Sequence, residues 1–317
     1  MTAPADSDLL SAVRAALAPR AVRSIDRRPS EYRTSFALEE LDVEVNDGEK
    51  LALMFKDLGA RALTPAARAA KPGFLRDPLR EIEVYRELLA PAQLGTPAFY
   101  GAETDPARGR YWLFVERVAG VELYQVGERS TWEYVARWLA RMHAQLEPCV
   151  GRAPHLVDQG ADYFRLWPER ARRFAAGGTR LLAHIAGRYD SVATRLAELP
   201  RTVIHGEFYA SNVLVDSTTT PRRVAPVDWE QAAVGPGLID LAAHASGRWT
   251  QSDRLAITAA YAHEMGLTSD DVGRDLDLCR LHLALQWLGW SEEWSPPAEH
   301  AHDWLREAEQ ITDTIGL

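Results

Sequence analysis

The sequence is poor in cysteine and contains no long apolar run. Its two cysteines, Cys149 and Cys279, are isolated in 317 residues, which fits a reducing cytoplasm better than a disulfide framework. No apolar stretch approaches the roughly 20 residues that a membrane-spanning helix needs. The N-terminus has no basic region followed by an apolar core, so we expect no secretory signal, no membrane partner and a cytoplasmic location.

Lysine is also scarce, and the charge balance is acidic. The chain has 36 Lys and Arg against 45 Asp and Glu, a formal net charge of −9. This balance argues against a general nucleic-acid partner, because affinity for phosphate backbones comes from clustered basic residues. It is compatible with a cationic substrate, although a solvated acidic surface would give the same charge. Only three lysines occur: Lys50, Lys56 and Lys71.

Apolar periodicity predicts an α+β chain in two parts, a first lobe over residues 1–116 and a second over 117–317. In the first part we expect a mostly antiparallel sheet and few helices. The expected strands are 34–38, 41–45, 51–55, 97–102 and 111–115, with helices at 8–17 and 78–89 and a loop over 59–73. The second part is mainly helical, with expected helices at 131–146, 163–175, 181–199, 238–247, 253–265, 270–294 and 298–315. The pattern gives no indication of the oligomeric state.

Polar residues follow short apolar strands within residues 203–230. The strands 203–204, 213–215 and 224–227 alternate with polar loops that carry Glu207, Asn212 and Asp228. Strand pairing would bring these loops together. Their oxygen atoms suit Mg²⁺, which takes one or two carboxylates and completes its shell with water and phosphates. A central carboxylate could also accept a proton from a hydroxyl, so the stretch favours phosphoryl transfer.

The run His205-Gly206-Glu207, then Asn212, then Asp228-Trp229-Glu230, resembles the HGD…N…DxE pattern of the aminoglycoside phosphotransferase family. These proteins are small-molecule kinases with a protein-kinase-like fold. The resemblance implies that ATP or GTP and Mg²⁺ are cofactors, that Glu207 is the catalytic carboxylate, and that Asn212 and Asp228 are metal ligands. The acceptor would be a hydroxyl of a small molecule such as an aminoglycoside, an amino sugar or an antibiotic-like metabolite.

One position departs from that pattern, because the family usually has Asp where this chain has Glu207. Glutamate is one methylene longer, and catalysis by positioning is sensitive to shifts of about 1 Å. The departure leaves an alternative open, a catalytically impaired pseudokinase that binds nucleotide and acts as a regulator or scaffold.

The nucleotide side of the site is predicted around Lys56, which ends the apolar run LALMFK. By resemblance, Lys56 contacts the nucleotide phosphates and pairs with a helical glutamate, either Glu81 or, as second choice, Glu83. Lys50 and Lys71 lack this placement, so we expect their removal to have little effect. There is no GxGxxG loop, but residues 29–36 lie where a phosphate-covering loop should be and include Ser35.

The remaining candidates are a hinge, two supporting residues and an acceptor pocket. Residues 116–120 resemble the family's hinge, with Glu116 and Val118 offering backbone groups to the nucleobase. His205 is expected to hold the loop backbone through its ring, and Asp240 to brace the same loop or to complement a helix N-terminus. Three tryptophans recur at helical spacing late in the chain, a pattern typical of core. The acceptor-pocket candidates are Asp162, Trp290 and Glu293.

Overall fold

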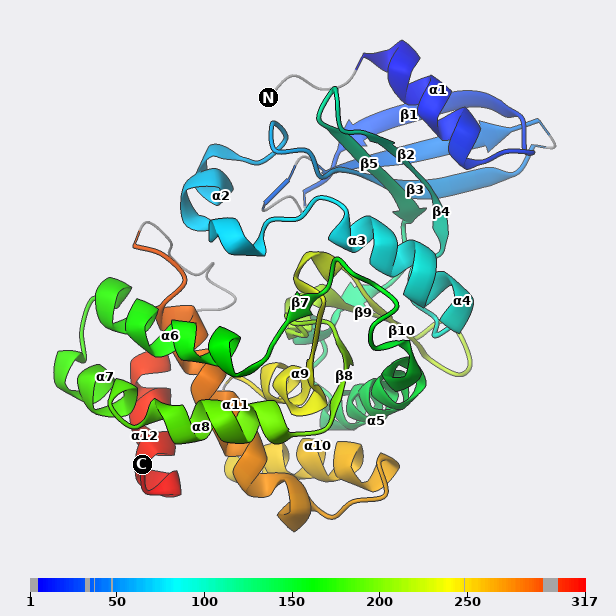
Figure 1. Cartoon of the computed structure of the whole chain (residues 1–317). Helices are drawn as coiled ribbons and strands as arrows, with labels where there is room; N and C mark the ends of the chain where they lie inside the picture. Colours follow the sequence, from blue (N-terminus) through cyan, green and yellow to red (C-terminus); the bar gives the residue numbers. More distant parts are fainter. Residues whose placement is uncertain (1–4, 32–34, 37, 47, 248, 293–301) are drawn as a thin grey trace.

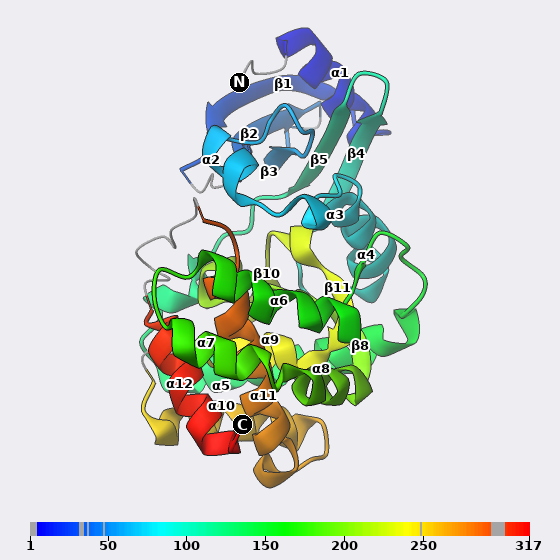
Figure 2. The ribbon, with the colours of Figure 1, turned by 60° about the vertical axis from the view of Figure 1, so that its left-hand side comes forward.

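The computed structural model describes residues 5–31, 35–36, 38–46, 48–247, 249–292 and 302–317. The chain forms a smaller lobe built on a five-stranded sheet and a larger, mainly helical lobe (Figure 1). The expected α+β architecture with an antiparallel N-terminal sheet is confirmed. Figure 2 shows the sheet on one side of the molecule and α5 to α12 on the other. Within the described ranges, no helix is long and apolar enough to cross a membrane.

The sheet of the smaller lobe has the order β1-β2-β3-β5-β4, with antiparallel neighbours throughout. Its strands are β1 (Val22–Pro29), β2 (Leu38–Val45), β3 (Lys50–Asp57), β4 (Phe99–Asp105) and β5 (Arg110–Glu116). Helix α1 (Asp6–Ala16) covers one face and buries Leu9 and Val13 against the strands. It lies so close to β4 that a Cβ on Gly101 would be 2.7 Å from the Cβ of Ala16.

Alternation along β3 decides which side chains reach the second lobe. Successive side chains of a strand point to opposite faces. Leu53 and Phe55 are therefore buried under α1, whereas Met54 and Lys56 face the space between the lobes. A shift of one residue in the β2–β3 register would exchange the two sets and remove Lys56 from the site.

Strand β1 was not expected from the sequence, because it is an exposed edge strand with little apolar alternation. Only Val22 is buried. Its arginines pair across the strands instead: Arg23 with Glu44 at 2.9 Å, and Arg27 with Glu39 at 2.7 Å. Charged side chains are typical of edge strands because they discourage pairing with other chains. A strand of this kind has no apolar pattern by which the sequence could predict it. Of the strands expected at 34–38 and 41–45, the second lies within β2, whereas the first overlaps β2 only at Leu38. Phe36 forms an isolated bridge with Leu63, and residues 34 and 37 lie outside the described residues.

The connection between β3 and β4 is more ordered than expected. The segment 59–73, predicted as a loop, contains helix α2 (Pro65–Ala70), whose N-cap Thr64 accepts a hydrogen bond from the N–H of Ala67 at 3.1 Å. The next helix begins at α3 (Arg80–Glu83), runs through the π-helical stretch η2 (Val84–Leu89) and ends in α4 (Ala90–Ala92). Alanine-rich helices such as α2 are too short to give a periodic signal.

The larger lobe consists of helices and two small three-stranded sheets. Its helices are α5 (Arg129–Leu146), α6 (Ala161–Phe174), α7 (Thr179–Ala186), α8 (Tyr189–Glu198), α9 (Gly237–His244), α10 (Gln251–Glu264), α11 (Ser269–Leu288) and α12 (Trp304–Ile315). The expected helix 181–199 is thus two helices, interrupted at Gly187 and Arg188. The helix expected to reach residue 294 ends at Leu288, and the start of the one expected from residue 298 lies outside the described residues.

The small sheets have the orders β10-β9-β6 and β7-β11-β8. The first contains β6 (Val121–Glu122), β9 (Val213–Asp216) and β10 (Arg223–Pro226), and the second contains β7 (Val157–Asp158), β8 (Arg201–Ile204) and β11 (Ala233–Pro236). The strand β8 before Glu207 therefore pairs with β11 and not with β9. The polar loops must be held together by other contacts.

Candidate active site

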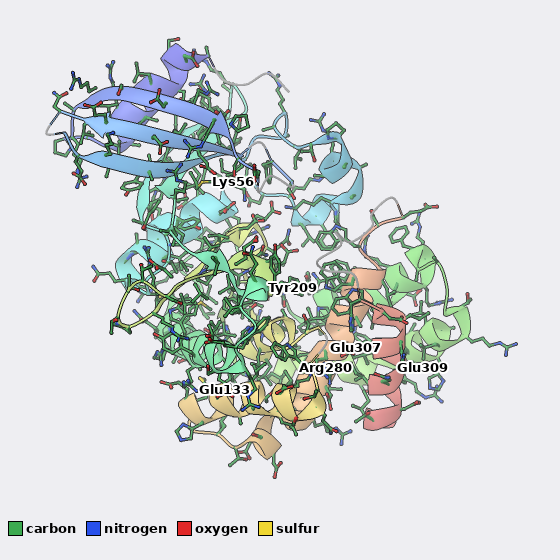
Figure 3. The ribbon with its side chains drawn as sticks, turned by 180° about the vertical axis from the view of Figure 1, so that it is seen from behind. Lys56, Glu133, Tyr209, Arg280, Glu307 and Glu309 are labelled. Atoms are coloured by element: carbon green, nitrogen blue, oxygen red, sulfur yellow. The ribbon has the colours of Figure 1, made fainter. Side chains whose placement is uncertain are left out.

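A cavity of about 1100 Å³ lies between the two lobes. Figure 3 places Lys56 at the edge of the sheet that faces the larger lobe, with Tyr209 of that lobe across from it. The cavity brings together most residues that the sequence singled out. Its lining includes Ser35, Lys56, Glu81, Glu116, Val118, Glu207, Asn212, Asp228 and Trp290.

Lys56 connects the two lobes electrostatically. Its ammonium lies 2.7 Å from the Glu81 carboxylate on α3 and is also paired with Asp228 on the other side of the cavity. Burial opposes the charged ammonium, but the carboxylates of Asp228 and Glu81 hold the pKa of Lys56 well above its usual range. Lys56 is therefore a fixed cation that faces the cavity. Glu83 pairs with Arg86 at 2.9 Å, so the structure selects Glu81 as the partner.

A buried carboxylate fixes the loop that carries Glu207. Asp240, fully buried near the start of α9, accepts hydrogen bonds from the backbone N–H of His205 at 2.7 Å and of Gly206 at 2.9 Å. The ring of His143 lies 3.1 Å from the same carboxylate. Gly206 has φ +83°, and a Cβ there would be 2.3 Å from the carbonyl oxygen of Gln231. Only glycine fits this turn.

His205 joins the Glu207 loop to the Asp228 loop. Its ring Nε2 donates to the carbonyl of Val227 at 2.9 Å, and its Nδ1 accepts from the backbone N–H of Glu207 at 3.3 Å. This pattern requires a neutral ring with the proton on Nε2. Burial favours the same state because it lowers the pKa of His205. His205 is thus placed as a connector with no free nitrogen to act as a base.

Asn212 and Asp228 lie on the two loops that the hairpin of β9 and β10 joins. The side-chain N–H of Asn212 donates to the backbone carbonyl of Glu207 at 2.9 Å, and the backbone carbonyl of Asn212 accepts from the backbone N–H of Val227 at 2.8 Å. The amide oxygen of Asn212 remains as a possible ligand. Asp228 has φ +65°, a left-handed conformation that is uncommon for residues other than glycine and that often accompanies function.

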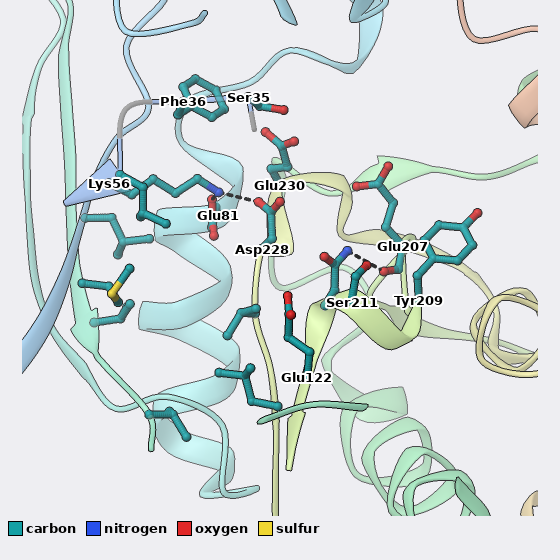
Figure 4. Close-up of a pocket in the computed structure, with 18 of the residues that line it drawn as sticks. Ser35, Phe36, Lys56, Glu81, Glu122, Glu207, Tyr209, Ser211, Asp228 and Glu230 are labelled. Atoms are coloured by element: carbon teal, nitrogen blue, oxygen red, sulfur yellow. Dashed lines mark hydrogen bonds and ion pairs between the residues drawn. The ribbon is translucent and has the colours of Figure 1, made fainter. Parts of the chain in front are cut away.

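The side chain of Glu207 extends into the cavity, as do those of Asp228 and Glu230 (Figure 4). Burial and then the neighbouring carboxylates of Glu230 and Asp228 raise the pKa of Glu207 to about 8. A carboxyl group with such a pKa exchanges its proton near neutral pH, as a general base requires. Cations that approach the three carboxylates would favour the ionised form.

The sequence reasoning missed a second lysine in this cavity. Lys71, which follows α2, is buried and ion-paired with Glu230 of the DWE motif. The expectation that its removal would have little effect is therefore not supported by its placement. Lys71 follows a run of small residues with no apolar strand, so no local pattern marked it. Glu230 lay in the motif and was the one available signal.

The hinge candidates lie on one wall of the cavity. The backbone N–H of Glu116 donates to the carbonyl of Ala98 at 2.8 Å, and the Glu116 side chain forms two 2.7 Å contacts with Arg223. Glu116 therefore braces the connection between lobes, while Val118 lines the cavity. The surrounding wall is apolar and is formed by Ala52, Met54, Leu214 and Val227.

Aromatic side chains form the wall next to Glu207. The indole N–H of Trp287 donates to the Tyr209 hydroxyl at 2.6 Å, and Trp290 stacks on Trp167 with centroids 6.0 Å apart. Trp287 and Trp290 both line the cavity. The prediction that these tryptophans are core residues therefore holds only for the parts of their rings that pack against other side chains. The prediction that Asp162 belongs to the acceptor pocket is wrong. Its side chain is fully exposed, pairs with Arg165 and does not line the cavity. Glu293 lies outside the described residues.

Comparison with known proteins places the chain in a family. The model described as the phosphotransferase enzyme family matches residues 38–276, whereas no curated protein matches significantly. Among solved structures, the chain is similar to choline kinase LicA from Streptococcus pneumoniae, with 12% identity over 98% of each chain and a TM-score of 0.61. It is also similar to a putative aminoglycoside phosphotransferase from Ralstonia eutropha, with 15% identity over 98% of this chain and 96% of that chain and a TM-score of 0.62. The GDP complex of wild-type aminoglycoside 2'-phosphotransferase-IIIa has 14% identity over 98% of each chain and a TM-score of 0.59.

The two-lobed fold and the family match define a phosphotransferase with a protein-kinase-like architecture. The chain belongs to the phosphotransferase enzyme family.

Proposed function

We propose that the protein transfers the γ-phosphoryl group of ATP or GTP, with Mg²⁺, to a hydroxyl of a small cationic molecule such as an amino sugar or amino alcohol. The observation that carries the proposal is the arrangement Glu81–Lys56–Asp228 beside Glu207 in one cavity. It joins a fixed cation for phosphates, oxygen ligands for a metal and a carboxyl group for the acceptor.

The donors present fit Mg²⁺ chemically. Asn212 and Asp228 offer an amide oxygen and a carboxylate, and Glu230 offers a second carboxylate nearby. No group of three or more His, Cys, Asp or Glu forms a ready-made metal site among the described residues. That is compatible with Mg²⁺, which relies on one or two carboxylates and on substrate phosphates. When bound, the metal would neutralise charge on the phosphates.

The nucleotide would occupy the part of the cavity nearest the sheet. Ala52, Met54 and Leu214 offer apolar surface to a planar base, and Val118 supplies backbone at the hinge. Lys56 would bind the phosphates because Glu81 and Asp228 keep its ammonium in the cavity. A solved structure with the same fold is a complex with GDP, which supports nucleotide use but leaves ATP and GTP as alternatives to be measured.

The acceptor would lie between Glu207 and the aromatic wall. The Glu207 carboxylate would orient the hydroxyl and accept its proton as the oxygen attacks phosphorus. The carboxylates of Glu207 and Glu230 favour a cation, and Tyr209, Trp287 and Trp290 offer aromatic surface to it. Solved structures with the same fold are named as aminoglycoside phosphotransferases and a choline kinase, which fits this choice of acceptor.

The pseudokinase alternative has no specific observation in its favour among the described residues. The only reason to consider it is the glutamate at position 207, and the backbone of that loop is held by Asp240 and His205. A loop held in this way can position the longer side chain.

The test is turnover with ATP or GTP and Mg²⁺ on a panel of amino sugars, amino alcohols and uncharged polyols. We expect a phosphorylated cationic product from the wild type. Glu207→Gln should lower kcat by about 10²- to 10⁴-fold with little change in nucleotide affinity, because the amide keeps the shape but cannot accept the proton. Nucleotide binding without any turnover would support the pseudokinase instead. Full activity of Glu207→Gln would remove Glu207 from the chemistry.

A further inference from the structure

Lys71 is a buried cation that the proposed function does not yet use. The residue follows α2, and its exposed fraction is 6%. Its ammonium is paired with the Glu230 carboxylate inside the cavity. Burying a charge is unfavourable unless partners compensate for the lost water. A lysine placed so deeply in a binding cavity therefore suggests a role in binding.

Two lysines flank one aromatic ring at this place. The Nζ of Lys56 lies 5.5 Å from the centroid of the Phe36 ring, and the Nζ of Lys71 lies 5.6 Å from it. They come from different elements, β3 and the end of α2. Lys56 pairs with Asp228 and Lys71 with Glu230, so each ammonium faces one carboxylate of the DWE motif. Two positive charges therefore face the same part of the cavity.

The backbone that carries Lys71 is fixed onto the DWE loop. The N–H of Lys71 donates to the carbonyl of Ala67 at 2.9 Å, which closes the last turn of α2. Farther along, the buried Arg80 donates to the carbonyl of Glu230 at 2.7 Å and to that of Leu75 at 2.9 Å. The segment 71–80 is thus anchored at both ends, and its lysine is preorganised for an anion.

Lys71 shares its cavity with the proposed base. Its partner Glu230 and the side chain of Glu207 both extend into that cavity (Figure 4). Lys71 is also among the cations that lower the pKa of Glu207, which burial and the carboxylates of Glu230 and Asp228 raise.

We propose that Lys71 binds the terminal phosphoryl group of the nucleoside triphosphate and follows it during transfer, whereas Lys56 holds the inner phosphates. The inference rests on the proposed function. A phosphoryl oxygen replaces the Glu230 carboxylate as partner of the Lys71 ammonium. The Glu230 carboxylate is then available as an oxygen ligand. The acceptor oxygen forms a bond to the γ-phosphorus, and its proton passes to Glu207. The bond from that phosphorus to the β-phosphate oxygen breaks, and the diphosphate leaves with the electron pair. Lys71 gains and loses no proton.

The test compares a diphosphate with a non-hydrolysable triphosphate. Dissociation constants for ADP and for the β,γ-imido analogue of ATP, each with Mg²⁺, are measured by titration calorimetry, and kcat is measured with the best acceptor. For Lys71→Met we expect at least about 10-fold weaker binding of the analogue and a kcat about 10²-fold lower, because one charge-assisted contact to the transferred group is lost. ADP affinity should change less than about twofold. Lys56→Met should weaken both nucleotides, and Lys50→Met, at an exposed position of β3, should change neither.

Two further variants guard against a purely structural effect. Lys71→Met leaves the Glu230 carboxylate buried without its partner, so the double variant Lys71→Met/Glu230→Gln is compared with Glu230→Gln alone. The added Lys71 substitution should again reduce binding of the analogue and not of ADP. Lys71→Arg, which keeps the positive charge, should restore the preference for the triphosphate.

Equal losses for ADP and the analogue, or no loss for either, would overturn the assignment of Lys71. A higher kcat in Lys71→Met would also overturn it, because the lysine would then be a latch that closes the carboxylate site. These results can be told apart from failure of the proposed function. In that case the wild type itself would bind no nucleotide or would transfer no phosphoryl group.

Discussion

The two lobes contribute differently to the charges in the cavity. The smaller lobe supplies both lysines, Lys56 and Lys71, with Glu81 beside Lys56, and the larger lobe supplies the carboxylates of Glu207, Asp228 and Glu230. Two of the three lysines in an arginine-rich chain therefore lie in one cavity. Lysine presents a compact point charge on a flexible stem, which suits a phosphate that must be gained and released. The pairing of charges across the cavity holds the free protein's lobes together where nucleotide would bind.

The lobes also differ in how their site residues are held. Lys56 depends on the register of a sheet whose outer strand is stabilised by exposed ion pairs, each worth about 0 to 1 kcal/mol. The loops of the larger lobe depend on a buried network through Asp240, His205 and His143. The smaller lobe thus supplies the positive charges of the site, while the larger lobe fixes the positions of the loops that carry its carboxylates.

The largest effect is expected from Asp228→Asn. The amide removes the negative charge that faces Lys56 and the metal, so we expect kcat to fall by at least about 10³-fold. The fold should persist, because the side chain borders the open cavity and is 28% exposed. Steady-state rates and circular dichroism measure the two effects. Asp162→Asn is the control, since that exposed carboxylate lies outside the cavity, and should leave rates unchanged. Comparable losses in both variants would mean that overall charge, and not the site, controls the rate.

An intermediate effect on activity is expected from Asp240→Asn. The amide keeps the size of the side chain but turns one acceptor oxygen into a donor, which faces the N–H of His205 or of Gly206. Leaving such a buried group unsatisfied costs about 1–3 kcal/mol of unfolding free energy, and the displaced loop should lower kcat about 10- to 100-fold. Denaturant unfolding and kinetics on the same variant test both effects. Normal stability and normal kcat together would show that the loop geometry does not depend on Asp240.

The smallest effect concerns acid stability of the larger lobe. Burial lowers the pKa of His244 to about 4, and its ring donates to the carbonyl of Trp132 at 2.9 Å. The unfolded chain takes up this proton near pH 6.5, so the free energy of unfolding should fall as the pH drops from about 6.5 to about 4. This one group accounts for at most about 3 kcal/mol.

Urea unfolding at pH 7 and at pH 5, for the wild type and His244→Gln, isolates that contribution. Glutamine can keep the donor toward Trp132 but does not titrate, so the wild type should lose more stability on acidification than the variant. Parallel losses would assign the acid sensitivity to other groups and weaken the contrast between lobes.

The local sequence predicted the structure best where residues must lie at a fixed spacing along the chain, either to face one side of a strand or to form one site. The apolar run of β3 singled out Lys56 as the residue that follows it, and the structure places its side chain on the face toward the cavity. The motif from His205 to Glu230 depends on short loops, so its members remain close in any fold that forms them. The glycine of that motif had to adopt a positive φ, which glycine alone does without strain. The sequence could not give the pairing of β8 with β11, since several short strands offered similar partners.

What the sequence by itself determined is the α+β two-lobed fold, the family pattern around residues 203–230 and the singular position of Lys56. These features are local, because periodicity and loop length act over a few residues. Only the tertiary structure decided that Lys71 meets Glu230, that Trp287 meets Tyr209 and that Asp162 faces solvent. Such contacts join residues far apart in the chain, and packing of whole elements against each other selects them. The charged edge strand β1 belongs to the same class, because its stability comes from partners on β2 and not from its own apolar pattern.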